Sequence, residues 1–244
     1  SRTINFDSFE PLVILAKEAG VKRFIYASSS SVYGVSTEKN VTENHPLLPL
    51  TLYNKYKGLC EPLLFKHQTA DFVCVAIRPA TLCGYSPRQR LDLTVNILTN
   101  WAINRRKINV FGGSQLRPNL HIQDMCDLYV KLLTETNDKI SGQTFNVGYQ
   151  NMSVMNIALL VKKIVEQETP KEAEISIEQS ISNDLRSYHI NSEKIKTVIG
   201  FEAQYTVEDA VRELCNAFKT NKLPSSFDDD RYFNVRQMKA VNAT

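Results

Sequence analysis

The segment FVCVAIRPATLCG at residues 72–84 restricts most strongly how this chain can fold. It is a near-continuous apolar run, which is typical of a strand that is covered on both faces. This run, like the other apolar stretches, is far too short to span a bilayer, so no membrane-spanning segment is predicted. We therefore expect a sheet that has helices on both sides.

Helical and strand-like segments alternate along the rest of the chain. Apolar residues at helical spacing predict helices at 6–21, 51–68, 92–105, 125–136, 153–168 and 207–221, and further strands are predicted at 23–29, 107–113, 144–148 and 174–179. Gly20 is predicted to end the first helix, the strand at 174–179 looks isolated, and the tail from Leu223 is predicted to be irregular. Such alternation indicates an α/β fold with a parallel sheet.

Composition excludes several other classes of protein. The 244 residues suit one large or two modest domains, with 43% hydrophobic and 23% charged residues. The net charge is only +3, and the densest basic patch, NRRK at 104–107, suits a solvated helix end better than a nucleic-acid surface. The five cysteines show neither CxxC spacing nor histidine partners at metal-ligand intervals. We expect no metal, no secretory signal and a reduced, cytoplasmic protein.

Tyr53 and Lys57 form the first candidate for chemistry. They are separated by four residues in a predicted helix, so they share one face. A phenol has an ordinary pKa of about 10. A neighbouring ammonium favours the phenolate, so the tyrosine could act as a general base near neutral pH. The same spacing also occurs by chance in many helices, so the pair alone does not identify a site.

A run of serines at 28–31 is the second candidate. It lies where a predicted strand ends and a loop begins, which is the usual location of ligand sites in open α/β sheets. A hydroxyl there could bind the same substrate oxygen as the tyrosine. A serine run after a strand is often only a loop, but the two patterns occur here in the order and on the elements that this chemistry needs.

With these motifs the chain resembles the extended short-chain dehydrogenase/reductases, specifically the nucleotide-sugar epimerase/dehydratase family. The resemblance covers almost the whole chain. It is carried by GVKRFIYASSSSVYG, YNKYKGLCE, IRPATLCG, VFGGSQLRPNLHIQDMCD, FNVG and DLRSYHINSEKIKTVIGF, in that order. Several of these motifs are loose individually, and their order and spacing make the combined match strong.

The resemblance implies roles for individual residues. The catalytic residues would be Ser29, Tyr53 and Lys57, with Tyr53 as the base or acid toward a sugar hydroxyl. The cofactor, NAD with NADP not excluded, would contact Ser28, Tyr53, Lys57, Arg78, Pro79 and Thr81. The family carries asparagine where this chain has Thr81, which puts the contacts at that position in doubt.

The nucleotide-diphosphate sugar would be held by a further set of residues: Ser30, Arg88, Arg90, Arg117 and Arg186. A guanidinium matches phosphate geometry with two parallel hydrogen bonds, so the arginines could hold the diphosphate. Arginines at a protein surface mostly serve only to solvate it, and this alternative applies to all four. His121, between Leu120 and Ile122, is expected to be a packed structural residue.

The residues after the loop hydroxyl restrict the reaction. Family members that dehydrate the sugar or decarboxylate a uronic acid carry acidic residues there, and this chain has Ser30 and Ser31. Epimerisation needs only reversible oxidation at one carbon. A UDP-glucose 4-epimerase-like isomerase is therefore the first expectation. A ketoreductase, a dehydratase or another epimerisation position remains an alternative.

The expected fold is a Rossmann-like doubly wound parallel sheet whose first strands are missing, with a smaller α/β substrate-binding C-terminal region. Residues 1–85 would be the C-terminal part of the dinucleotide-binding domain, and residues 86–244 mostly the substrate-binding region, with 118–148 returning to the first domain. None of the nine glycines forms a GxxGxxG or GxGxxG loop. We therefore expect residues 1–244 alone to bind NAD weakly or not at all, and micromolar affinity would contradict this.

Two function classes follow. The chain is either the catalytic portion of a nucleotide-sugar enzyme or a truncated, non-catalytic relative that binds sugar nucleotides as a scaffold. The resemblance also implies a homodimer through the helices at 6–19 and 51–68.

Overall fold

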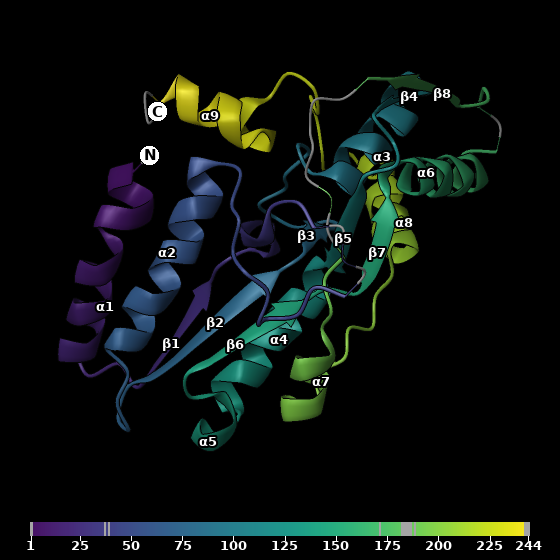
Figure 1. The fold of residues 1–244 in the computed structure, drawn as a ribbon. Helices are drawn as coiled ribbons and strands as arrows, with labels where there is room; N and C mark the ends of the chain where they lie inside the picture. Colours follow the sequence, from purple (N-terminus) through teal and green to yellow (C-terminus); the bar gives the residue numbers. More distant parts are fainter. Residues whose placement is uncertain are drawn as a thin grey trace. The chain divides into compact units, whose positions relative to one another are not determined.

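The computed structural model describes residues 2–36, 38, 40–170, 172–181, 187 and 189–241. These residues form two compact units (Figure 1). Unit 1 comprises Ser1–Ala80, Met125–Tyr149 and Arg186–Ala203, and unit 2 comprises Thr81–Asp124, Gln150–Leu185 and Gln204–Thr244. Each unit has its own sheets and helices and is described by itself.

Unit 1 is built on a three-stranded parallel sheet in the order β1-β2-β6. Its elements are η1 (Thr3–Asp7), α1 (Phe9–Glu18), β1 (Arg23–Ala27), η2 (Ser30–Tyr33), α2 (Leu52–Lys66), β2 (Val73–Pro79), α5 (Asn137–Ile140), β6 (Gln143–Val147) and α7 (Glu193–Ile199). Helix α4 (Ile122–Thr134) lies in unit 1 from Met125 onward. The parallel sheet confirms the expected fold class.

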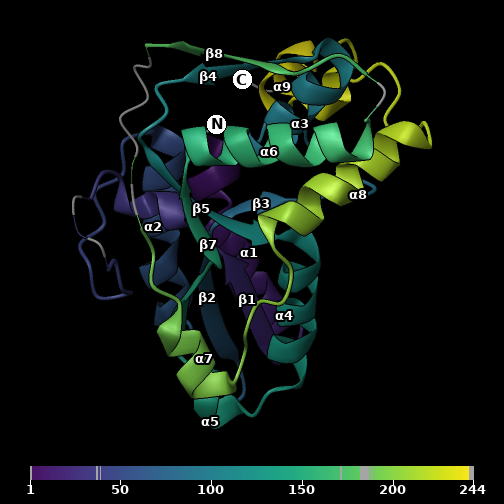
Figure 2. The ribbon, with the colours of Figure 1, turned by 90° about the vertical axis from the view of Figure 1, so that its right-hand side faces the viewer.

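Helices cover both faces of this sheet, as the apolar run at 72–84 predicted. Phe9 and Val13 of α1 and Leu64 of α2 pack against Tyr26 of β1 and the β2 residues of one face. The two views show α4 on the opposite face (Figures 1 and 2). All but the last residue of β2 is buried, because neither face of the central strand meets water.

The predicted strand at 72–84 is shorter than expected. It divides into β2, which ends at Pro79, and β3 (Thr81–Cys83), which belongs to unit 2. The amide of Ala80 donates to the carbonyl oxygen of Val147, which completes the β2–β6 pairing. Pro79 has no amide hydrogen to donate, and beyond it the chain pairs with a different strand, so one apolar run serves two sheets.

The predicted helix at 6–21 is also divided. It consists of the short π-helix η1 and of α1, with Ser8 between them. Ala19 caps α1, so Gly20, at φ +80°, follows the cap that it was expected to form. The second predicted helix, α2, is continuous despite Gly58 and Pro62.

Unit 2 contains two small sheets. The first has the order β3-β5-β7, with β3 parallel and β7 antiparallel to the central strand. The second pairs β4 with β8 in parallel (Figure 2). The elements are β3, α3 (Thr94–Arg105), β4 (Lys107–Phe111), β5 (Leu116–His121), β7 (Gln150–Ser153), α6 (Val154–Glu168), β8 (Ser176–Ser180), α8 (Val207–Lys219), η3 (Asp230–Tyr232) and α9 (Asn234–Ala240).

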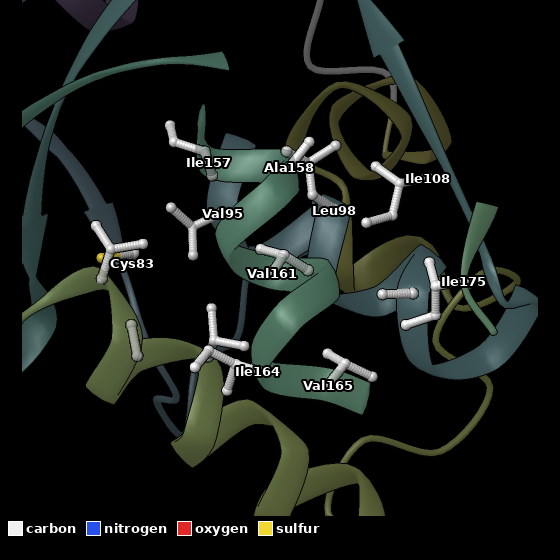
Figure 3. Close-up of a cluster of buried hydrophobic side chains, with 14 of the residues drawn as sticks. Cys83, Val95, Leu98, Ile108, Ile157, Ala158, Val161, Ile164, Val165 and Ile175 are labelled. Atoms are coloured by element: carbon white, nitrogen blue, oxygen red, sulfur yellow. The ribbon is translucent and has the colours of Figure 1, made fainter. Parts of the chain in front are cut away.

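The core of unit 2 forms around α6, whose amphipathic pattern was predicted. Ile157, Val161 and Ile164 are fully buried and pack with Val95 of α3 and Ile108 of β4 (Figure 3). A helix with one apolar face is stable because that face is removed from water against its neighbours. The prediction of this helix is confirmed.

Three predictions in unit 2 need correction. The strand at 174–179 is not isolated, because β8 pairs with β4 over five residues. The tail from Leu223 is not wholly irregular: it forms η3 and α9, and Leu223 and Tyr232 pack into a small core with Leu91. The strands β5 and β7 were not predicted.

The observed units do not follow the expected boundaries. Unit 1 ends first at residue 80 rather than 85, the chain re-enters it at 125 rather than 118, and it also contains 186–203. Two contacts explain why 186–203 belongs to unit 1. Ile190 forms an isolated β-bridge with Val41, and Lys194 donates to the carbonyl of Thr144. The binding roles assigned to the two regions stay predictions. No helix in the described part of the chain is long and apolar enough to cross a membrane.

Candidate active site

The serine run lies at the carboxyl end of β1, at an edge where parallel strands end together. The amide of Ser28 donates to the carbonyl of Ile77 at 2.8 Å, which extends the pairing of β1 and β2 by one residue. Ser29 has an extended backbone and begins η2, because its Oγ accepts a 3.2 Å hydrogen bond from the amide of Ser31. The loop hydroxyls are thus positioned by the end of a strand and by a helix cap.

Tyr53 and Lys57 lie in the first two turns of α2. Thr51 caps this helix, since its Oγ1 accepts a 3.2 Å hydrogen bond from the amide of Asn54. The Nζ of Lys57 lies 5.7 Å from the centre of the Tyr53 ring. The spacing of four residues therefore brings the ammonium beside the phenol ring, as the helical period predicts.

Two contacts join α2 to the serine loop. Lys57 donates from Nζ to the carbonyl of Ala27 at 2.7 Å, two residues before Ser29. Ser31 donates from Oγ to Oδ1 of Asn54 at 2.8 Å, next to Tyr53. The structure thus brings the serine loop against the helix that carries Tyr53 and Lys57, within unit 1.

Burial shifts the pKa values of two ionisable groups near the serine loop, Lys57 and Tyr26. It lowers the pKa of Lys57 from its ordinary value, partly offset by the nearby thiol of Cys60. Burial also raises the pKa of Tyr26, whose hydroxyl donates to the carbonyl of Lys57 and whose ring centre lies 5.1 Å from Nζ. Tyr26 is buried, whereas Tyr53 is 50% exposed. Of the two phenols beside Lys57, Tyr53 is the one that a ligand from solvent can reach.

Arg78 lies in a buried polar network. Its Nε and one terminal nitrogen donate to the two carboxylate oxygens of Glu61 at 3.0 and 2.6 Å. Its other terminal nitrogen donates to the hydroxyl of Tyr33 at 2.7 Å and to the carbonyl of Glu43 at 3.0 Å. Tyr33 in turn donates to Asn146 of β6 at 2.7 Å. This network ties α2, η2 and two strands together, and sequence reasoning missed it. A cofactor contact by Arg78 stays a prediction.

The other expected cofactor contacts lie in both units. Ser28 is buried in unit 1, and its Oγ has no partner among the described residues. Pro79 is half-buried at the carboxyl end of β2. Thr81 begins β3 of unit 2. Their roles stay predictions.

Three of the four expected diphosphate arginines lie in unit 2. Arg117 is buried in β5, where it donates to the carbonyl of Leu116. Arg88 donates to the carbonyl of Arg231 and to Asn234, and Arg90 makes an ion pair with Asp92. The hydrogen bonds that join Arg88 to the C-terminal tail were not predicted from the sequence.

Two expected substrate-binding residues remain, Ser30 and Arg186. Ser30 is buried in η2, while Arg186 lies outside the described residues. The diphosphate role of the arginines stays a prediction. His121 is packed as expected: it is buried, accepts a hydrogen bond from the amide of Gln123 and lies 3.1 Å from Glu213, and its structural role stays a prediction. No cluster of metal ligands occurs among the residues that the structure describes.

Comparisons with known proteins find relatives that act on nucleotide sugars. The chain is 27% identical over 225 residues to the dTDP-D-glucose 4,6-dehydratase of Mus musculus, covering 89% of the chain and 61% of that protein. It is 27% identical over 212 residues to an uncharacterised UDP-glucose epimerase of Bacillus subtilis, covering 85% of the chain and 64% of that protein. The chain thus spans about three fifths of the length of these relatives.

Solved structures show the same fold. The UDP-glucuronic acid 4-epimerase of Bacillus cereus, in complex with UDP-glucuronic acid and NAD, matches with a TM-score of 0.76 and 24% identity over 90% of this chain and 68% of that one. The RMD protein of Pseudomonas aeruginosa, in complex with NADPH, matches with a TM-score of 0.77 and 19% identity over 90% of this chain and 74% of that one. Residues 3–148 match the family model described as the NAD dependent epimerase/dehydratase family. The chain therefore belongs to the NAD-dependent epimerase/dehydratase family.

Proposed function

We propose that the polypeptide containing this chain is an NAD-dependent enzyme that epimerises a nucleotide-diphosphate sugar, at C4 of the sugar. The observation that carries the proposal is that two hydrogen bonds join the serine loop at the end of β1 to the helix that carries Tyr53 and Lys57. Relatives that act on UDP- and dTDP-sugars support the substrate class.

The residues present fit one end of a dinucleotide, while the sequence contains no glycine-rich loop for its pyrophosphate. They lie at the carboxyl ends of parallel strands, where such cofactors bind in open α/β sheets. Ser28 has a buried Oγ without a partner among the described residues, and the ammonium of Lys57 donates to the carbonyl of Ala27, the preceding residue. Ser28, Tyr53, Lys57 and the end of β2 would hold the group. When bound, its nicotinamide supplies a reversible hydride acceptor.

The chain's own residues would move the proton. Tyr53 removes the proton of the C4 hydroxyl as C4 is oxidised to a ketone, and Lys57 stabilises the phenolate by its positive charge. Ser29 orients the same oxygen by a hydrogen bond. After the sugar presents its other face, C4 would regain a hydride on that face and Tyr53 would return the proton to the oxygen, so the reaction would have no net redox change.

Serine residues after Ser29 favour epimerisation over dehydration. Dehydration needs an acid that protonates the departing hydroxide, and Ser30 and Ser31 provide no carboxyl group. The similarity to a 4,6-dehydratase keeps dehydration as the competing reaction. A ketoreductase differs from both because it consumes reduced cofactor.

The test uses the longest natural form of the polypeptide with NAD in deuterated water. UDP-glucose, UDP-glucuronic acid and dTDP-glucose are each supplied, and the products are followed by proton NMR. We expect one substrate to convert to its C4 epimer without deuterium at C5. A 4-keto-6-deoxy product with deuterium at C5 would establish dehydration instead. If no nucleotide sugar is turned over, the enzyme proposal fails and the non-catalytic scaffold that binds sugar nucleotides is the alternative that remains.

The homodimer remains part of the proposal. Leu12 and Leu15 of α1 are exposed, as are Leu52 and Leu59 of α2, seven residues apart on one face. Exposed leucines at helical spacing suit packing against a second copy of the same helices.

A further inference from the structure

A chain of three polar side chains leads from the catalytic serine into the protein. Ser29 Oγ lies 2.7 Å from Ser31 Oγ, which donates at 2.8 Å to Oδ1 of Asn54. Ser31 and Asn54 are buried, and Asn54 is only 2% exposed. All three residues belong to unit 1.

The hydrogen bonds of this chain have a fixed direction. The amide oxygen of Asn54 can only accept, so Ser31 uses its single hydroxyl hydrogen on Asn54. Ser29 must therefore donate its own hydrogen to Ser31. In this arrangement the hydroxyl of Ser29 can accept from a ligand but cannot donate to one.

Catalysis needs the opposite direction. The oxygen of the sugar gains negative charge as Tyr53 removes its proton, and a hydrogen bond donated by Ser29 stabilises that charge. An accepting Ser29 would instead compete with Tyr53 for the proton of the sugar hydroxyl.

Rotation of one amide reverses the whole chain. If the Asn54 side chain turns by half a rotation, its Nδ2 donates to Ser31, Ser31 donates to Ser29, and Ser29 donates outward. The two ends of the amide have nearly the same shape. In the observed orientation Nδ2 is buried without a partner among the described residues, and in the reversed one Oδ1 would take that position. Either orientation leaves one amide atom unpaired among the described residues, the nitrogen in the observed one and the oxygen in the reversed one.

We infer that Asn54 is a positioning residue which sets, through Ser31, whether Ser29 accepts from or donates to the sugar oxygen. The inference rests on the proposed function. It assigns to Asn54 and Ser31 a part in the reaction that acts through Ser29.

Two substitutions test the inference in the full-length enzyme. Ser31→Ala removes the link, and we expect kcat to fall about tenfold, the kinetic equivalent of one hydrogen bond, with KM changed less than about threefold. Ser31→Thr keeps a hydroxyl and should restore kcat to within about twofold of the wild type.

Asn54→Asp gives the sharper readout. Once ionised, the carboxylate can only accept, so it holds Ser29 in the accepting state. We expect kcat of this variant to approach the wild-type value at low pH and to fall about tenfold as pH rises through the titration of the new carboxyl group, a limb absent from the wild-type profile.

A matched control exists in unit 2, where Ser226 donates from Oγ to Oδ1 of buried Asn100 at 2.7 Å. Asn100→Asp tests the general effect of a buried carboxyl group and should leave the shape of the pH profile unchanged. Melting temperatures show whether each variant is folded.

The outcomes separate the inference from the proposed function. An active wild type, an inactive Tyr53→Phe, and a Ser31→Ala or Asn54→Asp variant with wild-type kcat and pH profile would overturn the inference alone. Equal turnover by wild type and Tyr53→Phe would remove the proposed function, and the inference with it. If Asn54→Asp does not fold, the Ser31 variants test the inference alone. A loss of kcat in Ser31→Ala that Ser31→Thr restores supports it, and unchanged kcat in Ser31→Ala overturns it.

Discussion

Lys57 donates a 2.7 Å hydrogen bond from its ammonium to the carbonyl oxygen of Ala27, the last residue of β1. This bond joins the helix that carries Tyr53 to the strand that leads into Ser29. One side chain thus positions two elements and places a positive charge near the phenol ring, and both effects vanish with it.

Replacing Lys57 should therefore impair catalysis in two ways. In the full-length enzyme, Lys57→Met is expected to lower kcat by about 100-fold or more, because general base catalysis contributes 10² to 10⁴. The pH at which kcat is half-maximal should rise, since the phenolate loses its neighbouring charge. Lys55→Met, at an exposed position of the same helix, is the control. A Lys57→Met profile that matches this control would show that the ammonium has no role.

Tyr26 should make stability depend on alkaline pH. Burial raises its pKa, so the folded protein keeps the phenol protonated where the unfolded chain loses that proton. Above the unfolded value of about 10 the folded state binds more protons, and stability falls as pH rises. The difference in unfolding free energy between wild type and Tyr26→Phe should decline by up to about 1.4 kcal/mol per pH unit there.

Urea unfolding between pH 8 and pH 11 measures this difference. Tyr149→Phe removes a phenol from an exposed position and serves as the control. A difference between wild type and Tyr26→Phe that stays constant over this range contradicts the assigned burial effect.

The ion pair of Glu61 and Arg78 should matter for stability. Both side chains are buried, at 4% and 6% exposure, so removing one charge leaves the other without compensation. Glu61→Gln is expected to lower the free energy of unfolding by about 3–5 kcal/mol. Glu202→Gln, which breaks the exposed pair with Lys196 in the same unit, should cost less than about 1 kcal/mol. Equal losses in denaturant titrations would show that burial does not decide the effect.

The exposed leucines of α1 test the proposed homodimer. Leu12→Glu combined with Leu15→Glu should raise the dimer dissociation constant by about 100-fold, because charges replace apolar contacts at the centre of the interface. Val130→Glu changes an equally exposed apolar residue on α4 and should leave the constant unchanged. Sedimentation equilibrium gives the constants. A wild type that is monomeric at all concentrations contradicts the proposal.

The sequence predicted those elements best whose structure depends on local hydrophobic periodicity alone. The buried run that forms β2 and the amphipathic pattern of α6 carry their structure in local periodicity. The pairing of Tyr53 with Lys57 follows from helical spacing alone. The serine loop was placed correctly at a strand end, because polar residues follow the last apolar residues of β1.

Elements that depend on distant partners were missed. Strand β5 contains Arg117, Asn119 and His121, all buried, and a polar segment of this kind shows no strand periodicity. The Nδ2 of Asn119 donates to the carbonyl of Gln150, and the imidazole of His121 lies 3.1 Å from Glu213, and both partners lie far along the chain. The Glu61–Arg78 pair was missed for the same reason, since a charged residue in a sequence does not reveal whether it is buried.

The most direct test of the central claim is the turnover of nucleotide sugars by Tyr53→Phe in the longest natural form of the polypeptide. Tyr56→Phe, which removes a phenol from the same helix where its ring stacks on Phe6, is the matched control. We expect Tyr53→Phe to lower kcat by about 10² to 10⁴ and Tyr56→Phe to leave it within about twofold. Unchanged kcat in Tyr53→Phe would contradict the assignment of Tyr53 as the group that moves the proton.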